Sequence, residues 1–307
     1  MRIAVVGAGG VGGGYGAALA HAGADVTFIA RGAHLAAMKS HGLKVESPRG
    51  DTHLVPTQAT DDPRSVRPVD VVLFCVKLWD VESAGEQIKP LVGPGTAVIP
   101  LQNGIDASER LAPILGPRAV MGGVANISAT IASPGVIRQT GMGLRMVFGE
   151  LDGSRSPRAE AFAAVCARAS IDGVLSTNIL GELWMKFILL ASNASLMAVT
   201  RLPIGKLRDD PDIAPLFTVA YQEVLDVGRA RGVVLPDDAI ERTLQFNRTV
   251  PPQLMASMAV DLLRGNRIEL PWLSGKVVEL GRQLGVPTPV HRLLYATLKP
   301  YTMGAPA

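Results

Sequence analysis

The sequence predicts an N-terminal α/β domain built on a doubly wound sheet, followed by an all-α C-terminal domain. Short apolar, β-branched runs alternate with helical segments in the first half of the chain, and strand signals stop after Ser176. The remaining residues carry helical spacing. A length of 307 residues also suits two domains of ordinary size. We therefore place the domains at residues 1–176 and 177–307.

The N-terminal half alternates strands and helices in the manner that builds a parallel sheet with helices on both faces. The expected strands are Ile3–Val6, Asp25–Ala30, Val69–Val76 and Thr96–Leu101. The expected helices are Tyr15–Ala22, Ala33–His41, Val81–Leu91, Ala107–Leu115 and Pro157–Ser170. Residues 43–56 suggest a small hairpin, and short β-like pieces in residues 121–148 suggest a partly antiparallel extension of the sheet.

The C-terminal half consists of segments with helical spacing that start and stop at Pro, Asp and Gly signals. The expected helices are Leu180–Val199, Ile213–Gly232, Pro236–Arg248, Pro252–Leu263, Leu270–Leu284 and Pro289–Leu298. We find no internal repeat. A nucleotide-binding half joined to a helical half is expected to hold its substrate at the carboxyl ends of the strands, between the two domains.

Composition and charge exclude several classes of protein. The formal charge is only +3 and the basic residues are scattered, so we expect neither a nucleic-acid partner nor a membrane surface. Cys75 and Cys166 are too few for a disulfide framework and match no metal-ligand spacing. The apolar run of residues 187–199 is too short to span a bilayer, and the start is not a signal peptide. We therefore expect a soluble, cytoplasmic protein without a metal site.

The first dozen residues carry the pattern of a dinucleotide-binding, Rossmann-type domain. A short apolar strand runs directly into Gly7-Ala8-Gly9-Gly10-Val11-Gly12, and a helix-compatible segment follows. One glycine makes the tight turn, the next admits the pyrophosphate to the backbone, and the third lets helix and strand pack closely. The helix N-terminus then offers N–H groups and a positive dipole to the phosphates. The alternative is a glycine-rich turn that binds nothing.

Arg31 indicates NADP(H) as the cofactor. NAD enzymes usually carry Asp or Glu about 20 residues past the glycines, where it accepts a hydrogen bond from the ribose 2′-OH. This chain has Ile29-Ala30-Arg31 there, and a guanidinium can hold a 2′-phosphate through paired hydrogen bonds. The alternative is a solvated arginine at the start of a helix. Nothing else in the chain suggests a flavin site.

Two further polar residues follow strands at their carboxyl ends. Lys77 follows the buried strand that ends at Val76 and is placed to attract a pyrophosphate or an acidic substrate; otherwise it is a surface lysine. Asn103 follows the next strand and can both donate and accept, which suits the nicotinamide ribose, its carboxamide or a substrate oxygen. The other interpretation of Asn103 is an Asn-Gly turn without a ligand.

Several motifs spread over essentially the whole chain resemble the ketopantoate reductases (2-dehydropantoate 2-reductases) and the wider family of NADP-dependent 2-oxo-acid reductases. The motifs are Gly7–Gly12 with Arg31, Val76-Lys77, Gln102-Asn103-Gly104, Glu182-Leu-Trp-Met-Lys186, Ser257, Glu269-Leu-Pro-Trp-Leu-Ser-Gly275 and Gly285-Val-Pro-Thr-Pro289. The resemblance implies hydride transfer from NADPH to the ketone of 2-dehydropantoate, giving (R)-pantoate for pantothenate and coenzyme A biosynthesis.

The resemblance also implies roles for particular residues. Lys186 matches the catalytic lysine that protonates the forming alkoxide, and Glu269 matches its partner near cofactor and substrate hydroxyl. Ser257 matches the serine at the substrate's carboxylate end, and Asn103 the asparagine beside nicotinamide and substrate. Partial burial is expected to bring the pKa of the lysine from about 10.4 towards neutrality. Without the resemblance, Lys186 fits a snorkelling lysine and Glu269 a first-turn glutamate.

The chain departs from the family pattern beyond the lysine. Better-known members carry asparagines four and eight residues after it, where this chain has Leu190 and Ala194. Asn193 lies almost two turns after Lys186 and is the candidate replacement for contact with the substrate. A missing amide is expected to relax or redirect substrate choice.

We therefore expect an NADPH-dependent reductase of a 2-oxo acid, with 2-dehydropantoate the favoured substrate. The alternatives are a paralogue that acts on another 2-oxo or 2-hydroxy acid and a non-catalytic NADP-binding sensor. Retention of both Lys186 and Glu269 argues against a sensor, which needs neither. The sequence is compatible with a homodimer.

Overall fold

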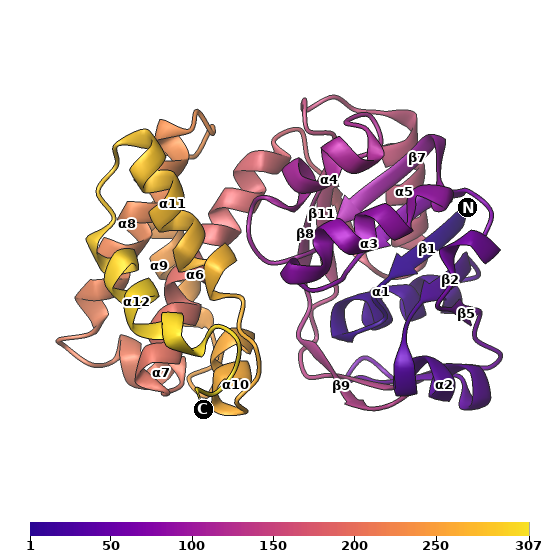
Figure 1. Cartoon of the computed structure of the whole chain (residues 1–307), viewed down its shortest axis with the longest axis horizontal. Helices are drawn as coiled ribbons and strands as arrows, with labels where there is room; N and C mark the ends of the chain where they lie inside the picture. Colours follow the sequence, from indigo (N-terminus) through magenta and orange to yellow (C-terminus); the bar gives the residue numbers. More distant parts are fainter. Residues whose placement is uncertain (307) are drawn as a thin grey trace. The chain divides into compact units, whose positions relative to one another are not determined.

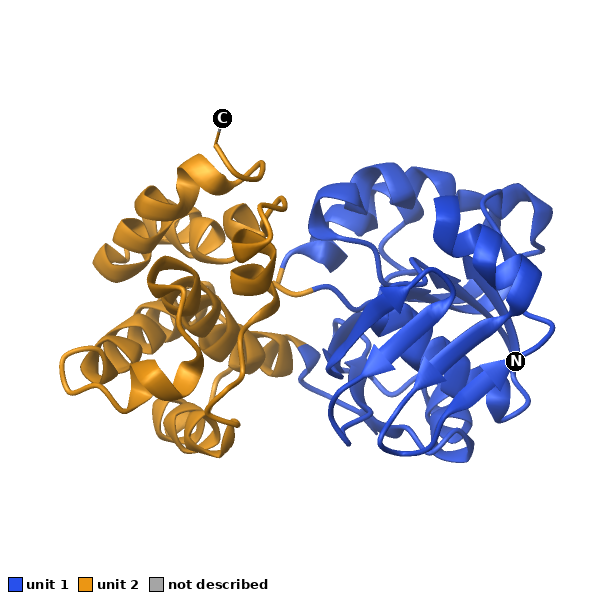
Figure 2. Cartoon of the chain, turned by 90° about the horizontal axis from the view of Figure 1, so that it is seen from below, with its two compact units in different colours: residues 1–102, 106–179 blue, residues 103–105, 180–307 orange. Residues whose placement is uncertain are grey.

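The computed structural model describes residues 1–306, which divide into two compact units. Unit 1 comprises Met1–Gln102 and Asp106–Ile179, and the described residues of unit 2 are Asn103–Ile105 and residues 180–306 (Figure 2). The boundary near Ile179 lies three residues beyond the one expected from the sequence. The grouping of Asn103–Ile105 with unit 2 was not predicted, because a three-residue segment after a strand carries no periodicity of its own.

A five-stranded parallel sheet forms the centre of unit 1 (Figure 1). Its strands, in spatial order, are β5 (Ala59–Thr60), β2 (Asp25–Ile29), β1 (Arg2–Val6), β6 (Val69–Phe74) and β7 (Val92–Pro100). The chain moves outward from β1 to β2 on one side and to β6 on the other. The topological switch point therefore lies between β1 and β6, where doubly wound sheets bind their ligands.

Alternate residues of β1 enter two different hydrophobic cores. Ile3 and Val5 belong to one core and Ala4 and Val6 to the other, and all four are buried. Strands buried on both faces need helices on both sides. The helices of this unit are α1 (Gly10–His21), α2 (Gly32–His41), α3 (Val81–Gln87), α4 (Ala107–Leu115) and α5 (Pro157–Arg168). These observations confirm the predicted doubly wound α/β class.

The remaining strands of unit 1 form two smaller sheets. One has the order β4 (Thr52–Leu54), β3 (Leu43–Glu46), β10 (Val136–Gln139) and β9 (Ala129–Ser133). The other has the order β12 (Asp172–Leu175), β11 (Arg145–Gly149) and β8 (Gly122–Asn126). The predicted hairpin at residues 43–56 is confirmed by antiparallel β3 and β4. The expectation for residues 121–148 is confirmed only in part. The Met121 N–H donates to the Val98 carbonyl oxygen of β7 (2.9 Å), beside the parallel bridge Val98–Val120, but the strands that follow form separate, partly antiparallel sheets.

In the described residues of unit 2 the regular secondary structure is all helical, as predicted. Its α-helices are α6 (Ile179–Thr200, which begins at the last residue of unit 1), α7 (Ile204–Arg208), α8 (Ala214–Ala230), α9 (Ala239–Thr249), α10 (Ser257–Leu263), α11 (Ser274–Leu284) and α12 (Pro289–Leu298). Short 3₁₀ helices also occur among residues 1–306: η1 (Pro63–Ser65), η2 (Leu78–Asp80) and η3 (Lys89–Leu91) in unit 1, and η4 (Leu270–Trp272) and η5 (Lys299–Tyr301) in unit 2.

The long helix α6 runs through the core of unit 2. By length and composition alone it would cross a bilayer, but 67% of its most apolar window is buried inside the protein, as in the core helix of a globular domain. Trp184 packs where Gly228 of α8 has no side chain, since a Cβ there would lie 2.7 Å from the indole. Phe187, Ile188 and Ala191 are fully buried. These contacts fix the rotation of α6 about its axis.

Candidate active site

The glycine loop of unit 1 has the geometry of a dinucleotide-binding turn. Gly7 has φ +90°, and its N–H donates to the Ile29 carbonyl oxygen (3.0 Å). A Cβ on Gly7 would lie 2.9 Å from the Cys75 backbone, and one on Gly12 would overlap the Gly7 carbonyl oxygen. The tight turn and the close packing of helix on strand therefore both require glycine.

Gly9 differs from the other two glycines, because a Cβ there would meet no protein atom within 4 Å. The protein's own packing does not need this glycine, and the space it leaves suits a ligand that approaches the backbone. Gly9 is also the N-cap of α1, so the N–H groups of Gly10, Val11 and Gly12 lie in its first turn, which holds no acidic residue. The predicted loop residues thus fit a dinucleotide pyrophosphate.

Two members of the predicted loop also have structural contacts. Ala8 is buried in the core of unit 1, and a Cβ on Gly10 would overlap the Ala129 carbonyl oxygen of β9. Only backbone groups of these two residues therefore remain for a cofactor. The outcome is consistent with phosphate recognition by main-chain N–H groups.

Arg31 lies at the carboxyl end of β2, as the N-cap of α2, with 72% of its side chain exposed. Its Nη2 lies 3.4 Å from Oδ2 of Asp80. The sequence singled out Arg31 but assigned no role to Asp80, which is 49 residues further along the chain. Their proximity follows from the sheet order, since β2 and β6 flank β1.

Lys77 and Gln102 lie at the carboxyl ends of β6 and β7. Lys77 is exposed, and its Nζ lies 5.4 Å from the centre of the Trp79 ring, a cation–π geometry. The Gln102 Nε2 donates to the carbonyl oxygens of Phe74 (2.8 Å) and Val76 (3.1 Å). This buried amide ties the two strand ends together, a structural role that the sequence motif did not reveal. Asn103, the next residue, is half-buried and groups with unit 2.

In unit 2, Lys186 lies on the face of α6 that is only partly covered by the rest of the unit. The residue is half-buried, whereas Leu183 and Phe187 on either side are buried. Desolvation lowers the pKa of Lys186 from its ordinary value of 10.5 to about 8, and the charge of Glu269 opposes that shift. The structure therefore brings Lys186 within electrostatic reach of Glu269, although 83 residues separate them in the sequence.

Glu269 is only 6% exposed and precedes η4 as its N-cap. A carboxylate buried to this extent requires a charged or hydrogen-bonded partner. Glu269 lies within electrostatic reach of Lys186, and a lysine with a pKa of about 8 can exchange a proton near neutral pH. Such a pair is suited to protonating an oxygen on which negative charge develops.

The side chain of Asn193 is held inside unit 2. Its Oδ1 accepts from the Tyr221 hydroxyl (2.6 Å), and its Nδ2 donates to Asn247 Oδ1 (3.0 Å). The residue is 6% exposed. The expectation that this amide contacts substrate is therefore not supported, because the one-residue offset turns it towards α8 and α9. Its hydrogen bonds instead join α6 to those two helices.

The other sequence-predicted residues of unit 2 are accessible to different degrees. Ser257 is exposed at the start of α10. Leu190, one turn after Lys186, is half-buried, and Ala194 is buried. Leu190, the partly exposed residue one turn beyond Lys186 on the same helix face, thus presents an apolar side chain.

A buried polar network that the sequence did not predict joins α6, which carries Lys186, to α11 and α12. Ser195 of α6 bonds to Ser274 (2.7 Å), which begins α11 five residues after Glu269, and Ser274 bonds to His291 Nδ1 (2.9 Å). His291 Nε2 faces the Ala220 carbonyl oxygen (3.1 Å), so this nitrogen carries the proton of a neutral imidazole. Burial lowers the pKa of His291 to about 4, which is consistent with that neutral state.

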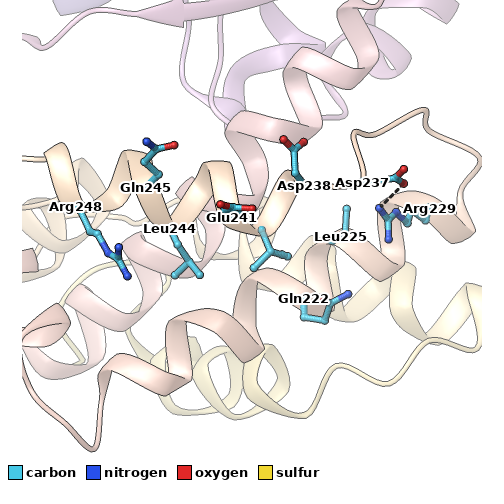
Figure 3. Close-up of a pocket in the computed structure, with 10 residues that line it drawn as sticks. Gln222, Leu225, Arg229, Asp237, Asp238, Glu241, Leu244, Gln245 and Arg248 are labelled. Atoms are coloured by element: carbon cyan, nitrogen blue, oxygen red, sulfur yellow. Dashed lines mark ion pairs between the residues drawn. The ribbon is translucent and has the colours of Figure 1, made fainter.

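Unit 2 also has a surface hollow of about 670 Å³ between α8 and α9 (Figure 3). Its rim carries both signs of charge, including the ion pair of Arg229 with Asp237 (3.7 Å). None of the predicted site residues lines it. In Figure 3 the side chains of Arg229 and Asp237 face each other at one end of the hollow.

Comparisons with known proteins agree with these features. The family model described as "Ketopantoate reductase PanE/ApbA" matches residues 3–153, and its C-terminal counterpart matches residues 178–302. The 2-dehydropantoate 2-reductases of Pyrococcus horikoshii and Caulobacter vibrioides are 29% and 31% identical to the chain; the matches cover 97% and 96% of the chain and 97% of each relative.

Solved structures show the same architecture. A PanE/ApbA family ketopantoate reductase from Ralstonia eutropha is 35% identical, with a TM-score of 0.90 over 98% of both chains. D-mandelate dehydrogenase, solved with NADH and anilino(oxo)acetate, shares the fold at 20% identity, with a TM-score of 0.90 over 98% of both chains. The matches to both family models span most of the sequence. The chain therefore belongs to the ketopantoate reductase family and is an oxidoreductase.

Proposed function

We propose that this protein catalyses the NADPH-dependent reduction of 2-dehydropantoate to (R)-pantoate, with Lys186 as the general acid. The observation that carries the proposal is the half-buried Lys186, whose pKa is lowered to about 8 while Glu269 lies within electrostatic reach. The 2-dehydropantoate 2-reductases that match over nearly the whole chain support the choice of substrate.

The nucleotide is assigned to unit 1. Gly9 leaves open space at the N-terminus of α1, and Arg31 presents an exposed guanidinium at the end of β2. The pyrophosphate would be held by N–H groups of the loop and the 2′-phosphate by Arg31. Lys77 adds positive charge at the same edge of the sheet. Bound NADPH supplies a hydride to the keto carbon.

Lys186 then performs the proton transfer. As the carbonyl carbon becomes tetrahedral, negative charge grows on its oxygen, and the ammonium of Lys186 stabilises that charge and donates a proton to give the hydroxyl. Glu269 keeps the lysine protonated, because its charge raises the pKa of Lys186. We assign Ser257 and Asn103 to the substrate's carboxylate and to the nicotinamide end, as the family pattern suggests.

A second candidate is the reduction of a 2-oxo acid with an apolar side chain, or the reverse oxidation. Leu190 is the partly open residue one turn beyond Lys186, and the amide of Asn193 is bonded to Tyr221 and Asn247. An apolar substituent is better accommodated beside leucine than a hydroxyl that needs a hydrogen-bond partner.

The test is the rate of NADPH oxidation, followed by ultraviolet absorbance, with 2-dehydropantoate and a panel of alkyl and aryl 2-oxo acids. The proposal expects the highest kcat/KM with 2-dehydropantoate. A higher kcat/KM with an apolar oxo acid would replace it by the second candidate. Lys186→Met is expected to lose most of kcat while NADPH still binds, and Lys206→Met, at an exposed lysine of α7, is the matched control. Cytoplasmic location and a homodimer stay predictions.

A further inference from the structure

The charge environment of Arg31 is unusual for a site that is to bind a 2′-phosphate. The carboxylate of Asp80 lies 3.4 Å from the guanidinium, and 31% of its side chain is exposed. The two residues come from different segments, Arg31 following β2 and Asp80 ending η2 beyond β6. A dinucleotide phosphate that contacts Arg31 would therefore also meet a negative charge.

Local secondary structure does not account for the orientation of the Asp80 side chain. Asp80 occupies the N-cap position of α3, where aspartate usually accepts hydrogen bonds from the first N–H groups of the helix. Here the side chain makes no such cap bond, and its Oδ2 faces Arg31 instead. The Asp80 carboxylate therefore makes no capping hydrogen bond to α3 and lies instead at the edge of the proposed nucleotide site.

The two ends of this ion pair favour different cofactors. A guanidinium at the end of the second strand favours a 2′-phosphate, and a carboxylate there favours the free 2′-hydroxyl of NAD. Most dinucleotide sites carry one or the other. The backbone of Gly7 packs directly on Cys75, so the segment that leads from β6 to Asp80 passes beside the glycine loop and brings the carboxylate to this edge.

We propose that Asp80 is a specificity-determining residue that reduces the preference for NADPH over NADH that Arg31 creates. The carboxylate repels the 2′-phosphate and competes with it for the guanidinium, and it accepts a hydrogen bond from an unmodified ribose. The protein is accordingly able to bind both nucleotides, with a small ratio between their affinities. This inference rests on the proposed nucleotide site in unit 1, but not on the identity of the oxo acid.

The experiment is calorimetric titration of the full chain with NADP⁺ and with NAD⁺, which requires no substrate or turnover. Asp80→Asn is expected to tighten NADP⁺ about tenfold and to weaken NAD⁺ several-fold, the size expected for removing one like charge near a protein surface. Arg31→Ala should weaken NADP⁺ much more than NAD⁺. Asp62→Asn, which breaks the exposed ion pair with Arg64 in the same unit, is the matched control and should change neither constant.

The possible outcomes separate the two levels of the proposal. If both nucleotides bind and Asp80→Asn leaves the ratio of their dissociation constants unchanged, the role of Asp80 is refuted while the nucleotide site stands. If the wild-type protein binds neither nucleotide, both are refuted. A wild-type preference for NADP⁺ above about a thousandfold would also overturn the inference, because Asp80 would then not be reducing the preference that Arg31 creates.

Discussion

The lowered pKa of Lys186 predicts that the rate of reduction falls as the pH rises through about 8. A general acid acts in its protonated form, so activity follows the fraction of Lys186 that is charged. With a pKa of about 8, that fraction is about nine tenths at pH 7 and about one tenth at pH 9. Above pH 8, kcat/KM for the oxo acid should therefore fall about tenfold per pH unit.

The size of the effect comes from desolvation. Lowering the pKa from 10.5 to about 8 corresponds to about 3 kcal/mol of destabilisation of the ammonium relative to the neutral amine. Glu269 offsets part of this cost. Because its charge raises the pKa of Lys186, Glu269→Gln should lower that pKa further and move the descending limb of the profile to a more acidic pH.

The assay is kcat/KM measured from initial rates between pH 6 and 10 at saturating NADPH. Glu279→Gln, at an exposed glutamate of α11, is the control for loss of a carboxylate and should leave the limb in place. Lys186→Arg should abolish the limb near pH 8, because arginine stays charged over this range. The reasoning is refuted by a wild-type profile that stays flat beyond pH 9, or by a Glu269→Gln limb that moves to higher pH.

Three further predictions concern binding and stability. Gly9→Ala should weaken dinucleotide binding without changing the melting temperature, since the new Cβ meets no protein atom. Gly12→Ala should lower the melting temperature, because its Cβ would overlap Gly7. Equal effects of the two variants on the melting temperature would contradict this reasoning. Lys186→Met should raise the free energy of unfolding at pH 7 by up to about 3 kcal/mol. This gain should shrink between pH 8 and 10.5, because over that range the folded wild-type protein has lost a proton that its unfolded chain still binds. A gain that stays constant with pH in urea titrations would contradict the prediction. His291, with its pKa lowered to about 4, should destabilise the fold as the pH falls from 6.5 to 4, and His291→Gln should flatten the dependence of melting temperature on pH in that window.

Much of the fold followed from local pattern. β1 and β6 were predictable because strands buried on both faces are continuous apolar runs, and the helices of unit 2 because their caps and spacing agree. The sheet partners of the strands from β8 through β12 were not predictable. Partners such as β3 and β10 lie about 90 residues apart, and such short strands fit more than one sheet.

The candidate site divides in the same way. Gly7, Gly9 and Gly12 follow from the steric needs of a turn, and Arg31 from its place after a strand. Asp80 was missed because the spacing rule for NAD sites looks near the end of β2, whereas this carboxylate arrives from beyond β6. Asn193 was assigned to the substrate because helical spacing gives the face of a residue but not its hydrogen-bond partners. His291 carried no signal, since a single histidine in a helix has many uses.

The glycines of α1 have a consequence for how the protein is made. The helix contains Gly10, Gly12, Gly13, Gly14 and Gly16, and a glycine in a helix interior costs about 1 kcal/mol relative to alanine. Cβ atoms on Gly13 and Gly14 would lie 2.7 Å and 2.5 Å from Ile137 and Ile127, so this face of the helix is stabilised by residues more than 100 positions later. During synthesis from the N-terminus, α1 cannot acquire these contacts until residue 137 has left the ribosome. The contacts that order α1 therefore depend on a segment of unit 1 that is translated more than 100 residues later.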